Sequence, residues 1–507
     1  MKIERTKNAK RNIFYGGINK VATLLLPFFV RTIMIKKLGA DYLGLNSLFS
    51  SILQVLNLAD LGIGQAIVYS LYKPIALDDT KTIKALMNFY RKAYFAIGLF
   101  IFLVGLIITP FLPLLINGNP PSGVNVYIIY LLYLSNTSLS YFLFAYKQAI
   151  LNALQRVDII TNANTITIGL MNLIQMVLLI IKPNYYIYII LLPSFTAIKN
   201  IILNIYCNRH YSEYAPEGKI DDGLRHQIRK QISGLMVNKV CDVSRNSFDS
   251  IFISSFISLS ITAIYNNYFF IITAITGMLQ IVTQAMLGGI GNSIAIESKE
   301  KNYQDMRKFN FIYLWISGWC SVCLLCLYQN FMYVWVGEKY IFPFSTMVLF
   351  VMYFYILKTG DIRSLYVDGS GIWWHTRLRA ILEAVTNIIL NYLLVQILGV
   401  KGIVLATLIS LCSFNFFYGS YITFKYYFKN DKLPEYYLDN LKCFMVTTTA
   451  ALVTYLFCNI LNGNGVVQLI IRATICIILP NIVFFIFYRR TRIYRCSKEW
   501  LLNKYKK

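Results

Sequence analysis

The stretch A-Y-F-A-I-G-L-F-I-F-L-V-G-L-I-I-T-P-F-L-P-L-L, residues 93–115, contains no charged residue. About 20 apolar residues are enough for a helix to cross the hydrocarbon core of a bilayer. A helix satisfies all its backbone hydrogen bonds internally, which lipid requires. Runs of similar length recur along the whole chain. The sequence therefore predicts an all-α integral membrane protein.

Composition supports this class. The chain has 507 residues, of which 57% are hydrophobic and 14% charged, whereas a soluble protein carries about 25% charged residues. The net charge of +25 would suggest nucleic acid for a soluble chain. Here the Lys and Arg residues lie between apolar runs, so membrane topology explains them and we expect no nucleic-acid partner.

The apolar runs predict about fourteen transmembrane helices. The expected spans are 12–35, 42–72, 93–115, 124–146, 159–181, 185–206, 232–256, 263–288, 309–328, 344–367, 380–398, 402–424, 443–461 and 466–488.

The distribution of basic residues sets the orientation. With a cytoplasmic N-terminus, the inside segments hold 35 Lys and Arg residues and the outside loops hold five. Cytoplasmic loops are enriched in Lys and Arg, so both termini are expected in the cytoplasm. The outer loops, such as 116–123, are short, which disfavours an external catalytic domain and indicates a protein that is not an enzyme.

A weak internal repeat suggests two lobes. Ile18–Val21 reads I-N-K-V and Val237–Val240 reads V-N-K-V, near the starts of the first and seventh spans. We expect two six-helix lobes around a central cavity, plus two C-terminal helices. The expected parts are an N-terminal lobe, a cytoplasmic linker, a C-terminal lobe, and the last two helices with a basic tail, at 1–211, 212–231, 232–430 and 431–507.

Several spans carry charges, which are costly in a bilayer unless they face water or a partner. In the seventh span, four charged residues fall on one face of a helix. They are Lys239, Asp242, Arg245 and Asp249. The first span adds Lys20 and Arg31, and the second adds Asn46, Asn57 and Asp60, with Gly62 and Gly64 allowing a kink or close approach.

These residues are the candidate site of a hydrated, mostly cationic cavity. Lys20, Arg31, Lys239 and Arg245, together with Asn266, would bind an anionic headgroup through charge-assisted hydrogen bonds. Asp60, Asp242 and Asp249 are candidates for coupling or gating. The competing interpretation is that the long basic side chains snorkel to the interface, and we assign Lys199, Arg363 and Arg472 to snorkelling or structural roles.

Three cysteines form the run C-x-x-C-x-x-C at Cys320, Cys323 and Cys326. They lie in an apolar helix without a fourth cysteine or a histidine nearby in sequence. We expect them to pack as small apolar side chains, and no metal site is expected.

One segment of the second span resembles a known family. Residues Leu58–Tyr69, L-A-D-L-G-I-G-Q-A-I-V-Y, resemble the D-L-G-x-G-x-A segment of Wzx-type polysaccharide flippases, in the polysaccharide-transport branch of the superfamily that includes MATE exporters. Further matches are Gly39–Leu45, Tyr146–Gln148, Asn246–Asp249, Trp335–Tyr340, Arg379–Asn391 and Gly399–Thr407.

The resemblance implies an alternating-access flippase of the bacterial inner membrane. Such a protein moves undecaprenyl-pyrophosphate-linked oligosaccharide outward for O-antigen, capsule or exopolysaccharide assembly. The resemblance also implies coupling to a proton or sodium gradient without a bound cofactor. The expected partners are the lipid-linked oligosaccharide, membrane lipids, a glycan polymerase and a chain-length regulator.

Three other functions compete with this one. A MATE-like drug or cation antiporter and an exporter of another lipid-linked precursor fit the same pattern. A membrane-embedded polymerase or ligase is the remote alternative, because such enzymes need a substantial outer loop and the three histidines fall on the expected cytoplasmic side.

Overall fold

The computed structural model describes residues 5–60, 63–226, 228, 243, 247–429, 431–460, 463 and 465–505. Throughout these residues the regular structure is helical, with no strand among them. The chain divides into two compact units, residues 1–263 and 264–507. The expected division into lobes, linker and tail stays a prediction.

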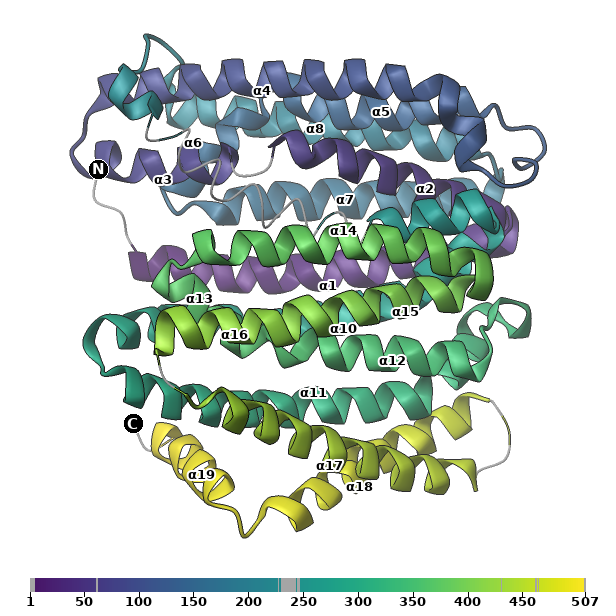
Figure 1. The fold of residues 1–507 in the computed structure, drawn as a ribbon. Coiled ribbons are helices and arrows are strands. Elements are labelled where there is room, and N and C mark those ends of the chain that lie inside the picture. The colour runs from purple at the N-terminus through teal and green to yellow at the C-terminus, as the bar shows by residue number, and fades with distance from the viewer. Residues whose placement is uncertain are drawn as a thin grey trace. The chain divides into compact units, whose positions relative to one another are not determined.

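The first unit is a bundle of long helices joined by short turns (Figure 1). Helix α1 packs along α7, which packs on α8; α8 packs on α5, and α5 on α4. The elements are α1 (Arg5–Lys37), α2 (Ala40–Leu56), η1 (Asn57–Asp60), α3 (Ile63–Ala76), α4 (Thr80–Ile108), η2 (Thr109–Leu115), α5 (Val126–Phe142), η3 (Ala145–Lys147), α6 (Gln148–Ala153), α7 (Val157–Ile181), α8 (Tyr185–His210) and η4 (Ser212–Tyr214).

Helix α10 (Leu259–Ile296) leads into the second unit, where α11 packs against α12, α17 and α18, and α14 packs against α15. The further elements are α11 (Lys299–Val336), η5 (Glu338–Tyr340), α12 (Phe344–Thr359), α13 (Asp361–Ser370), α14 (Trp373–Leu398), α15 (Val400–Ser410), η6 (Leu411–Tyr418), α16 (Gly419–Thr423), η7 (Phe424–Phe428), α17 (Leu433–Asn459), α18 (Val466–Tyr488) and α19 (Arg492–Tyr505).

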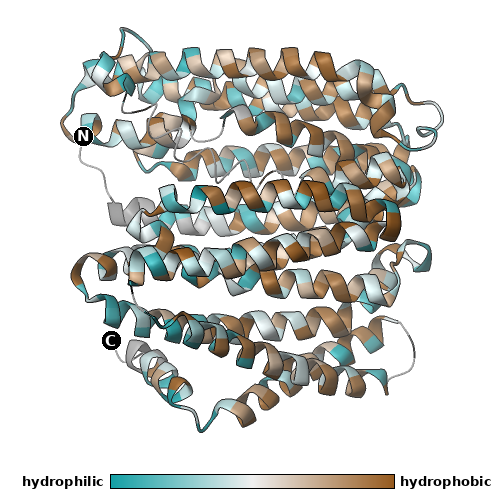
Figure 2. Ribbon diagram, viewed as in Figure 1, coloured by the Kyte–Doolittle hydropathy of each residue, from teal (hydrophilic) through white to brown (hydrophobic). Residues whose placement is uncertain are grey.

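The prediction of an all-α integral membrane protein is confirmed. Within the described residues, 11 helices are long and apolar enough to cross a membrane, or 12 if the pair α5 and Ala145–Ala153, bent by 49°, is one span. Hydrophobic residues dominate the middle of the long helices, and hydrophilic residues gather near their ends (Figure 2). Each of these helices coincides with a predicted span.

The two remaining predicted spans have different outcomes. The predicted span 232–256 lies mostly outside the described residues. The predicted span 42–72 is interrupted close to the kink expected at Gly62 and Gly64: α2 ends at Leu56, a 3₁₀ turn follows as η1, and α3 begins at Ile63. Gly64 permits a close approach near this break, because a Cβ there would lie 2.9 Å from Tyr90 Oη.

Several helices are longer than the apolar runs predicted. Helix α4 begins at Thr80, where Asp79 accepts hydrogen bonds from the backbone N–H and the hydroxyl of Thr82. These hydrogen bonds lower the pKa of Asp79 and satisfy backbone donors at the helix start. Hydropathy detects only the part of a helix that contacts lipid, so polar turns at its ends go unpredicted.

Candidate functional site

Asp60 lies at the break in the second predicted span, in the 3₁₀ turn η1. The hydroxyls of Tyr94 on α4 and Tyr141 on α5 each lie 3.4 Å from Asp60 Oδ2. Hydrogen bonds to a carboxylate stabilise its charged form. The break in the helix thus brings a carboxylate between the tyrosines of two neighbouring helices.

Aromatic rings surround this carboxylate. The rings of Tyr90 and Tyr94 have centroids 4.2 Å apart, and those of Tyr94 and Tyr141 are 5.3 Å apart. Tyr141 Oη also lies 3.3 Å from Asn57 Oδ1. The predicted polar residues of the second span, Asn57 and Asp60, therefore share one tyrosine partner.

A pocket of about 750 Å³ opens beside Asp60. We call it the Asp60 pocket. It combines one carboxylate, one lysine and five tyrosines with small polar and apolar residues, all from the first unit. The lining residues are Asp60, Gly64, Val68, Tyr69, Tyr72, Tyr90, Tyr94, Ser140, Tyr141, Ala145, Gln148, Ala149, Asn152, Val157 and Lys199.

The pocket also contains Lys199, whose place there the sequence did not predict. We expected it to snorkel or to have a structural role, yet it lines the pocket from α8. It lies near the middle of a 26-residue helix, where a lysine has far to reach for either interface. That depth was the signal in the sequence that could have identified it.

The chemistry of the Asp60 pocket suits a polar, partly anionic ligand. A lysine binds phosphate oxygens as a positive point charge. Tyrosine rings offer flat apolar faces, and their hydroxyls can donate or accept hydrogen bonds. Pockets of about 300–1,000 Å³ accommodate small-molecule ligands, so a headgroup-sized ligand fits and a long oligosaccharide would have to extend beyond the pocket.

Arg31 belongs to a second polar cluster of the same unit. Tyr133 on α5 and Tyr188 on α8 lie close enough to Arg31 to interact with its charge. Tyr133 donates a hydrogen bond to Asn46 on α2, so the predicted residues Arg31 and Asn46 share a tyrosine neighbour. Tyr133 and Tyr141 are two turns apart on α5, so this cluster lies about 12 Å from the Asp60 pocket along the helix.

The other predicted residues are more scattered. Lys20 is half-buried on α1, and no ion pair joins it to another residue that the structure describes. Asp249 is 3% exposed in the helical residues 247–256, and Asn266 is half-buried in α10. Lys239, Asp242 and Arg245 lie outside the described residues, so the stripe of the seventh span stays a prediction.

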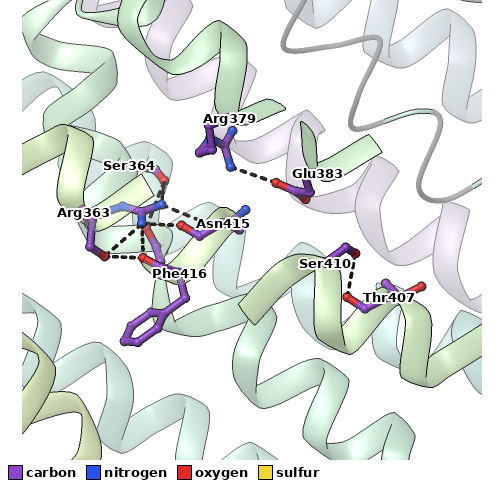
Figure 3. A network of polar contacts seen from close by, with 10 residues as sticks. Arg363, Ser364, Arg379, Glu383, Thr407, Ser410, Asn415 and Phe416 are labelled. Carbon is purple, nitrogen blue, oxygen red and sulfur yellow. Dashed lines mark hydrogen bonds and ion pairs between the residues drawn. The ribbon is translucent and has the colours of Figure 1, made fainter. Parts of the chain in front are cut away.

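Arg363 in the second unit is a buried cation with a structural role. It is 3% exposed, so the snorkelling alternative is wrong. Its Nη1 donates to the carbonyls of Asn415 at 2.6 Å and Phe416 at 3.2 Å and to Ser420 Oγ at 3.1 Å (Figure 3). The π-helical segment η6 makes carbonyls available there.

The acidic residues near Arg363 have basic partners of their own. Glu383 accepts from Arg379 at 3.0 Å (Figure 3). Asp361 accepts from Lys358 at 2.8 Å and from the hydroxyl of Tyr313 at 2.6 Å. Arg379 and Glu383 lie one turn apart on α14, and Lys358 and Asp361 lie on either side of the junction between α12 and α13. Pairing between residues close in sequence therefore accounts for these charges.

Solved structures resemble the chain over nearly its whole length. The lipid II flippase MurJ in an inward closed conformation matches with a TM-score of 0.65 and 14% identity, covering 94% of this chain and 99% of that one. The chain has the fold of that flippase.

Solved structures of multidrug transporters also resemble this chain. An inward-facing MATE family transporter of the MOP superfamily matches with a TM-score of 0.60 and 12% identity, covering 84% of this chain and 94% of that one. A mutant of the Vibrio cholerae MATE transporter VcmN matches with a TM-score of 0.54 and 14% identity, covering 85% of this chain and 99% of that one. No protein-family model matches the sequence, and no curated protein matches it. The chain is thus a multi-pass membrane protein with a transporter fold.

Proposed function

We propose that the chain is an alternating-access flippase. Its substrate is an undecaprenyl-pyrophosphate-linked oligosaccharide, moved across the bacterial inner membrane for O-antigen, capsule or exopolysaccharide assembly. A proton or sodium gradient drives the movement. A glycan polymerase and a chain-length regulator then act on the exported substrate.

The Asp60 pocket is the observation that supports this proposal. It places Lys199, five tyrosines and a carboxylate around one space of about 750 Å³. A pyrophosphate carries negative charge and a sugar presents an apolar face with a rim of hydroxyls. The lysine binds the pyrophosphate. The tyrosine rings stack on the apolar face of the sugar, and their hydroxyls hydrogen-bond its hydroxyl groups.

The roles divide by charge. Lys199 joins Lys20, Arg31, Lys239, Arg245 and Asn266 as the proposed headgroup ligands. Asp60, Asp242 and Asp249 are the proposed coupling or gating residues, because a carboxylate can take up a proton or sodium ion. The hydrogen bonds of Tyr94 and Tyr141 hold Asp60 beside the proposed substrate position.

Reconstitution into vesicles tests the proposal. The probe is undecaprenyl pyrophosphate that carries one labelled N-acetylglucosamine, and the readout is its appearance in the opposite leaflet. We expect an imposed proton or sodium gradient to accelerate the appearance. A rate equal to that of protein-free vesicles would refute the flippase proposal.

A MATE-like cation antiporter is the second candidate. The carboxylate of Asp60 among tyrosine rings would also suit an organic cation, since aromatic faces attract cations, and MATE transporters share the fold. The same vesicles loaded with ethidium distinguish the two. Gradient-driven ethidium movement without movement of the lipid probe would support the antiporter instead.

A further inference from the structure

Three cysteines from three different helices meet in the second unit. Cys326 on α11, Cys458 on α17 and Cys476 on α18 have Sγ atoms that all lie within 4.8 Å of one another. They are 7%, 2% and 0% exposed. Sequence spacing could not reveal this group, because only Cys326 belongs to the C-x-x-C-x-x-C run.

We propose that Cys326, Cys458 and Cys476 form a thiolate site for a soft d¹⁰ cation of the Zn²⁺ class. Zinc–sulfur bonds are about 2.3 Å long, so three sulfurs around one ion lie about 4 Å apart. The observed cluster needs to contract by less than about 1 Å to reach that geometry. Thiolates without a histidine or carboxylate ligand favour soft cations over Mg²⁺ or Ca²⁺.

The backbone around Cys476 holds its side chain toward α11. Pro480 lies four residues later in α18 and has no N–H to donate to the Cys476 carbonyl. Trp319 Nε1 donates to that carbonyl instead at 2.8 Å, and Cys323 Sγ donates at 3.8 Å. Two residues of α11, the helix that also supplies Cys326, therefore hold the backbone of Cys476 in place.

A nearby arginine offsets the charge that the site would gain. Binding releases three thiol protons to the solvent and forms three sulfur–metal bonds, so three thiolates and one Zn²⁺ carry a net charge of −1. Arg472 lies one turn before Cys476 on α18 and acts electrostatically on Cys458. Such a partner lowers the cost of a buried negative charge.

The bound ion would fasten α17 and α18 to α11. Each of the three helices supplies one ligand, so the ion links elements that otherwise pack largely through apolar side chains and a few hydrogen bonds. An ion that binds the folded state alone stabilises that state. Cys458 is the penultimate residue of α17, so one of the three ligands lies near a helix end.

Cadmium titration tests the proposal. Full-length protein is purified in detergent with a phosphine reductant, stripped with a chelator and titrated with Cd²⁺. We expect one equivalent to bind with an ultraviolet thiolate-to-cadmium band and a rise in melting temperature. Affinity should fall as pH falls, since the thiols must lose protons. The unaltered protein failing to bind Cd²⁺ would overturn the proposal.

Variants locate the site. Cys458→Ala and Cys476→Ala should each weaken Cd²⁺ binding at least about tenfold, because mutation of even an outer-shell partner costs about 10–100-fold in metal affinity. Cys320→Ala, on the same helix as Cys326 but outside the cluster, should bind normally. Equal binding by all three variants would refute the assignment. Should Cys476→Ala fail to fold, Cys458→Ala at the helix end decides alone.

Discussion

Tyr141 Oη lies 3.4 Å from Asp60 Oδ2. The tyrosine belongs to α5, and the aspartate belongs to the 3₁₀ turn that interrupts the second predicted span. A charged residue at a break in a membrane helix is therefore held by a neighbouring helix. This arrangement fixes the carboxylate where the Asp60 pocket opens.

Replacing Tyr141 with Phe should slow probe transport by about fivefold. The change removes a hydroxyl that hydrogen-bonds Asp60 and keeps the ring, and loss of one such bond costs about 1 kcal/mol. Initial rates in vesicles measure the effect. Tyr127→Phe, an exposed position on the same helix, is the control and should leave the rate unchanged; an equal effect of both changes would deny Tyr141 a specific role.

Replacing Lys199 with Gln should weaken binding of the pyrophosphate probe by about tenfold. The change removes the positive charge that lines the Asp60 pocket, and a charge-assisted hydrogen bond is worth about 1.5–3 kcal/mol. Equilibrium binding of the labelled lipid to purified protein measures the loss. Lys182→Gln, an exposed position just before the same helix, should bind like the unaltered protein. Unchanged affinity of the Lys199 variant would place the headgroup elsewhere.

Gly44→Ala should destabilise the first unit strongly. A Cβ at Gly44 would lie 2.0 Å from the carbonyl oxygen of Leu259, so backbone must move at a cost of about 3 kcal/mol or more. Gly169→Ala is the matched control, because a Cβ there meets only Leu26 at 4.0 Å and alanine stabilises a helix by up to about 1 kcal/mol. Melting temperatures in detergent should shift in opposite directions, and equal shifts would contradict the close packing.

Arg363→Ala should lower the melting temperature, with a loss of about 3 kcal/mol in stability. The carbonyl and the side-chain oxygen of Asn415 lose the guanidinium that donates to them, whereas the Phe416 carbonyl keeps the hydroxyl of Ser420 as a donor. Buried acceptors without a donor cost about 1–3 kcal/mol each. Arg490→Ala, at an exposed position, should change stability by less than about 0.5 kcal/mol. A melting temperature unaffected by the Arg363 change would mean that the π-helical segment is stable without the hydrogen bonds of Arg363.

Hydropathy predicted the spans well because lipid imposes one rule on every crossing helix. Helix α18 begins and ends at the predicted residues 466 and 488. The same signal could not predict the break after Leu56 or the π-helical segment Leu411–Tyr418, because both change hydrogen-bond register without changing apolar character.

The candidate site was predicted only in part. Asp60 and Asn57 were identified because charges and amides are rare in apolar runs. The tyrosines around Asp60 and the lysine Lys199 were not, since the pocket gathers residues from segments far apart in the sequence. Helical periodicity relates residues on one helix, whereas this pocket depends on how several helices pack.

Transport of the labelled lipid probe by the Asp60→Asn variant tests the central claim most directly. Asparagine keeps the size of the side chain and one acceptor oxygen for the tyrosine hydroxyls, and it removes the charge. We predict a gradient-driven rate about a hundredfold lower, equivalent to about 2.7 kcal/mol, at unchanged protein abundance, with the exposed Asp222→Asn control at full rate. A normal rate for Asp60→Asn would contradict the claim that this carboxylate couples the pocket to transport.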